Sequence, residues 1–322
     1  MINKVFYGIK EDMKTEVHTI LGAGGVIGRE LMRELAAYTS QVRLVHRHPA
    51  FPPAGMEVRA ADLLNGDQVS EAVRGSTVAY LVAGLPYRTG VWQAEWPVIM
   101  GNVIKACKRH AVRLVFFDNV YLYGCVDGPM TEETPITPCS AKGAVRARIA
   151  GMLMDEIRAG NLSGLIARAA DFYGPDATNT FVHPMVFELV RDGKKAAWLC
   201  NGDVPHSMIF TPDAARATAR LGNTEDAFGQ VWHLPVAPDP PTGKQFIEMV
   251  AGAFQTKPRY RILGTGLLRL VALVNATVRE SIELLYQNQR PYLVDSSKFR
   301  RRFFAATPYR KGIEKTVRCM KR

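Results

Sequence analysis

The stretch Val17-His-Thr-Ile-Leu-Gly-Ala-Gly-Gly-Val-Ile-Gly28 leads directly into the run from Arg29 to Tyr38. Its apolar first part suits a buried strand, and the apolar residues around and after Gly28 recur at helical spacing. The glycines therefore stand where a strand turns into a helix, as in a βαβ unit. We take this turn as the feature that decides the fold.

Each glycine has a physical reason to be there. Gly22 permits the tight turn, Gly24 or Gly25 lets the backbone approach a pyrophosphate, and Gly28 lets helix and strand pack closely. The amino end of the helix then faces an anion. With a strand before it and a helix after it, the motif favours a dinucleotide site over a glycine-rich turn without a ligand.

Runs that suit strands and helices alternate along the rest of the chain. We expect strands at 41–46, 57–62, 77–83, 113–119, 162–168 and 231–234, helices at 67–74, 93–110, 141–159 and 211–218, and a proline-rich loop at 49–55. This alternation predicts an α/β fold with a doubly wound parallel sheet. Because the rhythm becomes irregular after residue 168, we expect a cofactor domain over 17–170, with returning segments near 204–235. A smaller, non-contiguous substrate lobe is expected mainly over 171–322.

Charge and composition narrow the class of protein. The 322 residues are 47% hydrophobic and carry a net charge of +11, with basic clusters at 300–302 and 311–322. No nucleic-acid module accompanies these clusters, so an anionic cofactor or substrate is favoured over nucleic acid. The apolar run 267–274 is too short to span a membrane, and we interpret it as a buried helix.

The compartment is inferred from the cysteines and the amino end. Five cysteines, odd in number and without CxxC spacing, suit a reducing cytoplasm better than a disulfide framework or a zinc site. The first sixteen residues are polar and lack the apolar core of a signal peptide. We therefore expect a cytoplasmic protein with no membrane partner.

The end of the second expected strand indicates which dinucleotide binds. A ribose 2′-hydroxyl is normally held by a carboxylate there, whereas a 2′-phosphate needs a cation. This chain has His46-Arg47-His48, so Arg47 favours NADP over NAD. The two histidines lack a third ligand, so no metal site is expected. Asp62, after the third strand, is a candidate acceptor for the adenine amino group, or simply a turn-forming residue.

Several motifs together resemble a known family. They are Gly22-Ala-Gly-Gly-Val-Ile-Gly28, Ala61-Asp62-Leu63, Val120-Tyr-Leu-Tyr-Gly124, Asp171-Phe-Tyr-Gly-Pro175 and Asp295-Ser-Ser-Lys298. The chain resembles the extended or atypical short-chain dehydrogenase/reductases of the NAD-dependent epimerase/dehydratase group. The resemblance implies a Rossmann sheet with a small substrate lobe. The residues expected to contact the cofactor are Gly22, Gly24, Gly25, Val26, Ile27, Gly28, Arg47, Asp62, Leu63, Ala83, Gly84, Lys142 and Ala170.

The resemblance also implies catalytic groups. In that family a Ser or Thr after the fifth strand acts with a Tyr-x-x-x-Lys pair, whose lysine lowers the tyrosine pKa and holds the nicotinamide ribose. Asn119 stands at the Ser position, and Lys142 matches the lysine. Four residues earlier stands Pro138, which cannot titrate. The usual tyrosine is therefore missing.

Three explanations remain open. Tyr121 follows Asn119 by two residues, and in an extended strand both side chains share one face about 7 Å apart, so Tyr121 could supply the phenol. Alternatively Tyr121 only packs the sheet edge, and Lys142 or a water transfers the proton. Cys139 and Ser140 are adjacent thiol and hydroxyl alternatives. Finally, the protein could bind NADP(H) without catalysis and act as a sensor.

The expected substrate groups lie in and before the irregular half. By the resemblance, Ala170 lies beside the nicotinamide and Asp171 beside the substrate, and Tyr123 and His206 are further candidates, with the region of Tyr286 and Tyr292. We expect an NADP-dependent oxidoreductase, of reductase or epimerase/dehydratase type, acting on a carbonyl, hydroxyl or sugar-nucleotide substrate. The positive net charge is compatible with an anionic substrate. By analogy of fold alone, a homodimer is expected.

Overall fold

A computed structural model describes residues 16–48 and 56–321. The expected polar extension before Glu16 and the proline-rich loop at 49–55 lie outside these residues. Among the residues described, no helix is both long and apolar enough to cross a lipid bilayer.

The centre of the described chain is a sheet of seven strands in the order β11-β7-β5-β4-β1-β2-β3, with every neighbouring pair parallel. Its strands are β1 (Val17–Leu21), β2 (Gln41–His46), β3 (Glu57–Ala60), β4 (Val78–Leu81), β5 (Arg113–Asn119), β7 (Gly164–Ala169) and β11 (Val231–His233). The order reverses at β1, which pairs with both β2 and β4. The expected doubly wound parallel sheet is confirmed.

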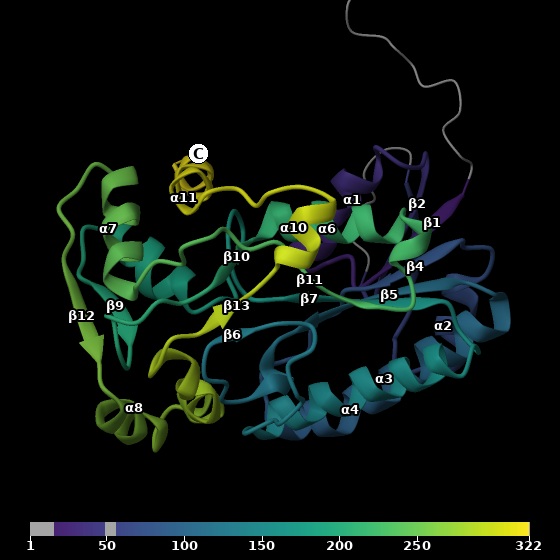
Figure 1. The fold of residues 1–322 in the computed structure, drawn as a ribbon, viewed down its shortest axis with the longest axis horizontal. Coiled ribbons are helices and arrows are strands. Elements are labelled where there is room, and N and C mark those ends of the chain that lie inside the picture. The colour runs from purple at the N-terminus through teal and green to yellow at the C-terminus, as the bar shows by residue number, and fades with distance from the viewer. Residues whose placement is uncertain (1–15, 49–55, 322) are drawn as a thin grey trace, which may run out of the picture.

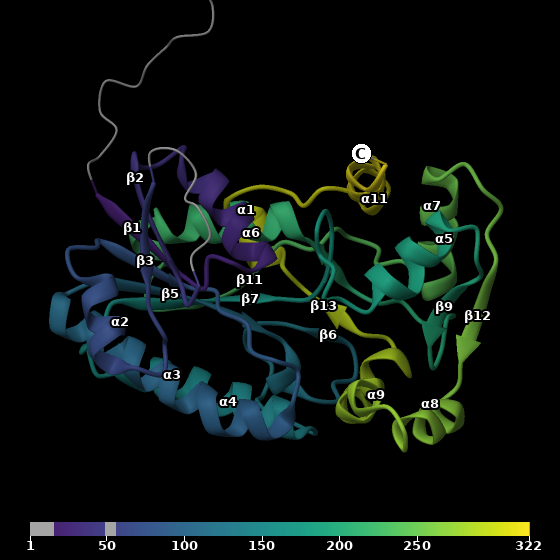
Figure 2. The same ribbon diagram turned by 180° about the vertical axis from the view of Figure 1, so that it is seen from behind.

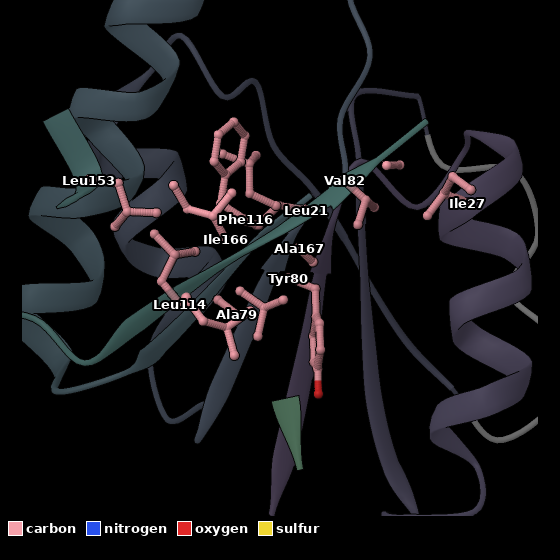
Figure 3. Close-up of a cluster of buried hydrophobic side chains, with 14 of the residues drawn as sticks. Leu21, Ile27, Ala79, Tyr80, Val82, Leu114, Phe116, Leu153, Ile166 and Ala167 are labelled. Atoms are coloured by element: carbon pink, nitrogen blue, oxygen red, sulfur yellow. The ribbon is translucent and has the colours of Figure 1, made fainter. Parts of the chain in front are cut away.

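Helices cover both faces of the sheet, as Figures 1 and 2 show. One face carries α2 (Gly66–Val73), α3 (Thr89–His110) and α4 (Ala141–Arg158), and the other carries α1 (Val26–Leu35) and α6 (Thr211–Gly222). Because both faces are covered, the central strand β4 reads as a continuous apolar run, whereas the edge strand β3 is partly exposed. In Figure 3, Leu114, Phe116 and Ile166 of neighbouring strands point toward Leu153 of α4. Each of these side chains is fully buried, which stabilises the fold by about 1.5–3 kcal/mol per side chain.

The later part of the chain builds a second apolar core. Tyr173, Trp198 and Phe246 meet there at ring-centroid distances between 5.7 and 6.1 Å. Its elements include β8 (Asp171–Tyr173), η2 (His183–Glu188), α5 (Leu189–Arg191), β9 (Ala196–Leu199), β10 (Met208–Phe210), α7 (Gly243–Ala253), β12 (Tyr260–Leu263) and α11 (Tyr309–Met320). This lobe lies beyond the carboxyl ends of the central strands (Figure 1).

The remaining elements are short. They are η1 (Tyr121–Tyr123), β6 (Pro129–Met130), η3 (Glu225–Ala227), α8 (Thr265–Ala272), α9 (Ala276–Ser281), η4 (Ile282–Asn288), β13 (Leu293–Val294) and α10 (Ser297–Arg302). The pairs β8–β10, β9–β12 and β6–β13 are parallel two-stranded ladders. The pair β6–β13 joins the segment after β5 to the carboxyl-terminal part of the chain.

The expectation of a buried helix at 267–274 is wrong. Within α8 only Leu268 and Ala272 face inward, whereas Leu270 is 64% exposed and Val274, just after the helix, is 89% exposed. The run of apolar residues at 267–274 suggested that the whole helix is buried. The helix lies at the rim of the molecule (Figure 2), so only one of its faces is covered.

Candidate active site

The glycine turn lies at the carboxyl end of β1. Gly22 has φ +99°, and a Cβ on it would lie 2.4 Å from the Cα of Ala83, which follows β4. A Cβ on Gly28 would lie 2.7 Å from the Cα of Ala23. The structural roles expected of Gly22 and Gly28 therefore agree with this geometry. Their part in binding stays a prediction.

The next two glycines differ from each other. A Cβ on Gly24 would lie 2.3 Å from Nε2 of His46, so Gly24 makes room for this ring, whereas a Cβ on Gly25 would meet only Gly22 O at 3.8 Å. Gly25 is the N-cap of α1, where no side chain caps the helix and no acidic residue occupies the first turn. The backbone amides of Val26 and Ile27 can therefore receive an anion. These features fit the pyrophosphate of a dinucleotide.

The other expected cofactor residues lie along the same sheet edge. His46 ends β2, and its Nδ1 lies 3.1 Å from the amide nitrogen of His48. Arg47 is exposed and makes no hydrogen bond or ion pair with any residue that the structure describes. Asp62 Oδ1 accepts the Leu64 amide at 3.0 Å, which is the turn-forming role considered above. The remaining four residues also follow strands of the sheet. Leu63 comes after β3, Ala83 and Gly84 come after β4, and Ala170 comes after β7.

Lys142 occupies the first turn of α4 and is fully buried. Its ammonium donates to Thr89 Oγ1 at 2.7 Å, to the Glu280 carbonyl at 2.8 Å and to Glu280 Oε2 at 2.9 Å. It also contacts Glu283 Oε1 at 2.8 Å. Since an ammonium has three donors, four acceptors leave none free.

The two glutamates reach Lys142 from the C-terminal half of the chain. The hydrogen bond from Lys142, followed by those from the Thr89 amide and hydroxyl, lowers the pKa of Glu280 to about 2. Glu283 Oε2 also accepts the Ala141 amide at 2.6 Å at the amino end of α4, where a negative charge is favoured. Sequence reasoning missed this cluster. The only indication of this cluster in the sequence is that the two carboxylates, Glu280 and Glu283, are three residues apart.

Tyr121 does not continue the strand, so the premise that it shares a strand face with Asn119 is wrong. β5 ends at Asn119, whose Oδ1 accepts the Tyr121 amide at 3.1 Å and starts the turn η1. The Tyr121 and Tyr87 phenols influence each other's pKa, so the two side chains lie near each other. Burial raises the pKa of Tyr121 well above its usual value. Tyr87 in turn lies against Lys142, whose Nζ is 4.9 Å from its ring centroid.

Asp171 and His206 are brought together, although they are 35 residues apart. His206 Nε2 lies 2.9 Å from Asp171 Oδ2, and its Nδ1 lies 3.2 Å from the Gln287 carbonyl. His206 is buried, whereas the Asp171 side chain is 14% exposed. The negative charge of Asp171 contributes to the raised pKa of Tyr121, after burial and the neighbouring Tyr87. Asp171 begins a strand, β8, rather than a turn.

Tyr123 lies in the interior, which corrects its expected role in substrate binding. Its side chain is fully buried, and its hydroxyl accepts from Arg168 Nη1 at 2.6 Å and lies 2.7 Å from His233 Nε2. Because His233 Nδ1 lies 2.9 Å from the Asp295 carbonyl, Nδ1 carries the proton and Nε2 accepts from Tyr123. Burial, then the charge of Arg168, lowers the pKa of His233 to about 3. This network joins the sheet to the C-terminal half.

No cluster of three or more His, Cys, Asp or Glu side chains suited to a metal ion occurs within the described ranges. Cys125 and Cys139, which the sequence separates by 14 residues, have their sulfur atoms 3.2 Å apart. These two free thiols therefore lie next to each other, which their separation in the sequence did not indicate.

The comparisons with known proteins agree with this architecture. A model of the NAD dependent epimerase/dehydratase family matches residues 18–233. Among curated proteins, no sequence matches the chain.

Many solved structures share the fold. MoeE5 in complex with UDP-glucose and NAD has a TM-score of 0.78 and 19% identity, covering 95% of this chain and 98% of MoeE5. For UDP-N-acetylglucosamine 4-epimerase from Bacillus cereus the TM-score is 0.76 and the identity 14%, over 95% and 96% of the two chains. A double mutant of DesIV, a dTDP-glucose 4,6-dehydratase from Streptomyces venezuelae with NAD and DAU bound, gives 0.74 and 17%, over 94% and 96%. At such identities the likeness shows the fold.

Proposed function

The chain belongs to the NAD dependent epimerase/dehydratase family, and from this premise we propose that it is an NADP-dependent enzyme acting on a carbonyl or hydroxyl group. Members of this family are enzymes that use a nicotinamide dinucleotide, so the general class is an oxidoreductase or epimerase. The finer proposal adds the choice of NADP, the proton donor and the substrate class.

The observation that carries the proposal is the anion-binding turn with Arg47 beside it. The amino end of α1 is uncapped, and no carboxylate follows β2 in the described residues to repel a 2′-phosphate. Arg47 is exposed and unpaired among the described residues, so its guanidinium is free to bind a phosphate bidentately. MoeE5 and DesIV were solved with NAD, which makes NAD the alternative to be tested.

When bound, the nicotinamide supplies or accepts the hydride. The chain's own contribution is the proton, and we assign this to Tyr121. This phenol is protonated at neutral pH and is the donor that we propose for the oxygen of a carbonyl undergoing reduction. Because burial raises its pKa, it is a weaker acid than a tyrosine whose pKa is lowered by a lysine. Tyr87, which is 37% exposed and lies near Tyr121, returns a proton from solvent. Asn119 positions Tyr121 by accepting its amide hydrogen.

Lys142 stays the proposed orienting residue for the nicotinamide ribose, but it acts under a restraint. All its donors are used by Thr89, Glu280 and Glu283, so contact with a ribose requires exchange of at least one acceptor. Cofactor binding is thereby linked to the position of α9 and η4.

The substrate lies, in this proposal, between the cofactor domain of residues 17–170 and the lobe formed mainly by 171–322. Asp171, whose side chain is 14% exposed, is suited to bind a substrate hydroxyl group, and the buried His206 holds this carboxylate in place. A sugar nucleotide is the favoured class, since MoeE5 was solved with UDP-glucose. A homodimer in the cytoplasm remains part of the proposal.

The test is hydride transfer. A panel of UDP- and dTDP-sugars and simple carbonyl compounds is incubated with NADPH deuterated on the nicotinamide, and mass spectrometry detects deuterium in the products. Tyr121→Phe should lower turnover by a factor on the order of a hundred to ten thousand. Tyr260→Phe, in the distant strand β12, is the matched control and should be unaffected. An active enzyme with unchanged Tyr121→Phe rates would remove Tyr121 from the mechanism.

A second candidate function is an NADP(H)-sensing protein without turnover. It is favoured by Pro138 at the family tyrosine position and by the full occupation of the Lys142 ammonium. Tight NADPH binding with no deuterium transfer to any compound of the panel would support the sensor over the enzyme.

A further inference from the structure

Two thiols meet at the edge of the candidate site. Cys125 follows η1 and Cys139 precedes α4, and their sulfur atoms lie 3.2 Å apart. Both residues are exposed, so a small reagent in solution can reach them. A disulfide needs the sulfur atoms at about 2.0 Å, which requires only a small side-chain movement from this position.

The backbone around the two cysteines keeps them together. Gly124 has φ +69°, and a Cβ on it would lie 2.2 Å from the Thr137 carbonyl oxygen and 3.0 Å from the Cys139 nitrogen. The Thr137 hydroxyl donates to the Tyr123 carbonyl at 3.1 Å. Because Tyr123 is itself fixed in the core, the segments 123–125 and 137–139 are held in contact. The thiols are therefore brought together by the fold rather than by chance collision.

We propose that Cys125 and Cys139 form a reversible dithiol–disulfide site that reacts with a low-molecular-weight disulfide such as oxidised glutathione. The Cys125 thiolate attacks one sulfur of oxidised glutathione, forms a mixed disulfide and releases one glutathione thiolate. The Cys139 thiolate then attacks the Cys125 sulfur and expels the second glutathione. Two protein thiols are oxidised, one glutathione disulfide is reduced, and the two thiol protons go to the two glutathione molecules.

The order of attack follows from the surroundings of the two thiols. Partial burial, then the neighbouring Cys125, raises the pKa of Cys139 to about 11. The thiolate is the nucleophile in such exchange, so Cys139 reacts through the small fraction of it that is ionised, and its reaction is faster at higher pH. In the mixed disulfide at Cys125, Cys139 is held next to the sulfur that it attacks, which suits it to the resolving step.

The bridge would act on the catalytic side chain through α4. Cys139 adjoins Ser140, the N-cap whose Oγ accepts the Gly143 amide at 3.0 Å, and Lys142 lies in the same turn. A covalent link from Cys139 to the segment after η1 fixes this turn relative to Tyr121. Oxidation is consequently expected to slow the exchange of hydrogen-bond acceptors at the Lys142 ammonium.

The experiment counts thiols in the full-length protein. The fully reduced protein is incubated with oxidised glutathione, denatured, and titrated with a thiol reagent. We expect the five cysteines of the chain to fall to three titratable thiols, with a mass lower by two hydrogens, and a peptide in which Cys125 and Cys139 are linked. Reduction with dithiothreitol should restore all five.

Variants distinguish the proposed pair from other cysteines. Cys125→Ser and Cys139→Ser should no longer lose two hydrogens, and the remaining cysteine should instead carry glutathione or stay unmodified. Cys319→Ser, which removes another exposed cysteine, should still lose two thiols. Five thiols after oxidation of the wild type, a glutathione adduct without an internal bridge, or a bridge to any other cysteine would overturn the proposal. Since thiol counting needs neither cofactor nor turnover, its failure is distinct from a failure of the proposed function.

Discussion

Replacing Lys142 by methionine tests the cluster that connects the two halves of the site. Methionine keeps a long apolar stem but removes the ammonium, and Glu280 and Glu283 then face each other without a counter-ion. Removing one partner of a buried ion pair costs about 3–5 kcal/mol. The two glutamate side chains are 27% and 24% exposed, so water relieves part of this cost and we expect about 2–3 kcal/mol.

The assay is equilibrium unfolding in urea at neutral pH. Lys108→Met is the matched control, because Lys108 makes one ion pair at 2.8 Å with Glu156 on the surface, and its loss should cost less than about 1 kcal/mol. The pH dependence sharpens the test. Because the pKa of Glu280 is about 2 in the folded protein against an ordinary 4.5, its contribution is present above pH 4.5 and is lost as the pH falls toward 2.

The stability gap between wild type and Lys142→Met should therefore close over that pH interval. Adding Glu280→Gln to Lys142→Met should recover part of the loss at neutral pH, because one unpaired charge is removed. A gap below about 1 kcal/mol at neutral pH, or one equal to the Lys108→Met effect, would refute the reasoning.

Three further outcomes are expected from the fold. Gly22→Ala should lower the free energy of unfolding in urea by at least about 2 kcal/mol, because Gly22 has a positive φ and its Cβ would meet adjacent backbone. Gly90→Ala is the control, since a Cβ at Gly90 meets open space, and equal effects of the two substitutions would contradict this prediction. Tyr123→Phe should cost about 1–3 kcal/mol because it leaves Arg168 and His233 with unpaired buried atoms, and a neutral effect would refute the network. Because the pKa of His233 is about 3 when folded against 6.5 when unfolded, stability should fall as the pH is lowered from 6.5 toward 3, and His233→Asn should flatten that slope in a pH series of urea midpoints.

The part of this molecule that the sequence predicts is the part built from local periodicity. β1, the glycine turn and α1 are contiguous, and the buried runs of β4 and β5 alternate with helices whose polar faces are legible in the sequence. The turn at Gly22 and the packing at Gly28 follow from the absence of a side chain. These features depend on neighbours within a few residues.

The cluster around Lys142 could not be predicted because its contacts are distant. Lys142 and Glu280 are 138 residues apart, and nothing in either segment indicates the other. The same holds for Asp171 with His206 and for Cys125 with Cys139. Tyr121 was misplaced for a local reason, since the Asn119 side chain accepts the Tyr121 amide and ends the strand. The exposure of α8 depends on its place at the rim, which composition does not reveal.

The central claim is that this fold binds NADP through the turn at Gly22–Gly28 and Arg47. Isothermal titration with NADPH and with NADH, for the wild type and for Arg47→Ala, tests it most directly. We expect tighter binding of NADPH than of NADH, and an Arg47→Ala variant that loses this preference while keeping NADH affinity. Tighter binding of NADH by the wild type, or an NADPH preference unchanged by Arg47→Ala, would contradict it.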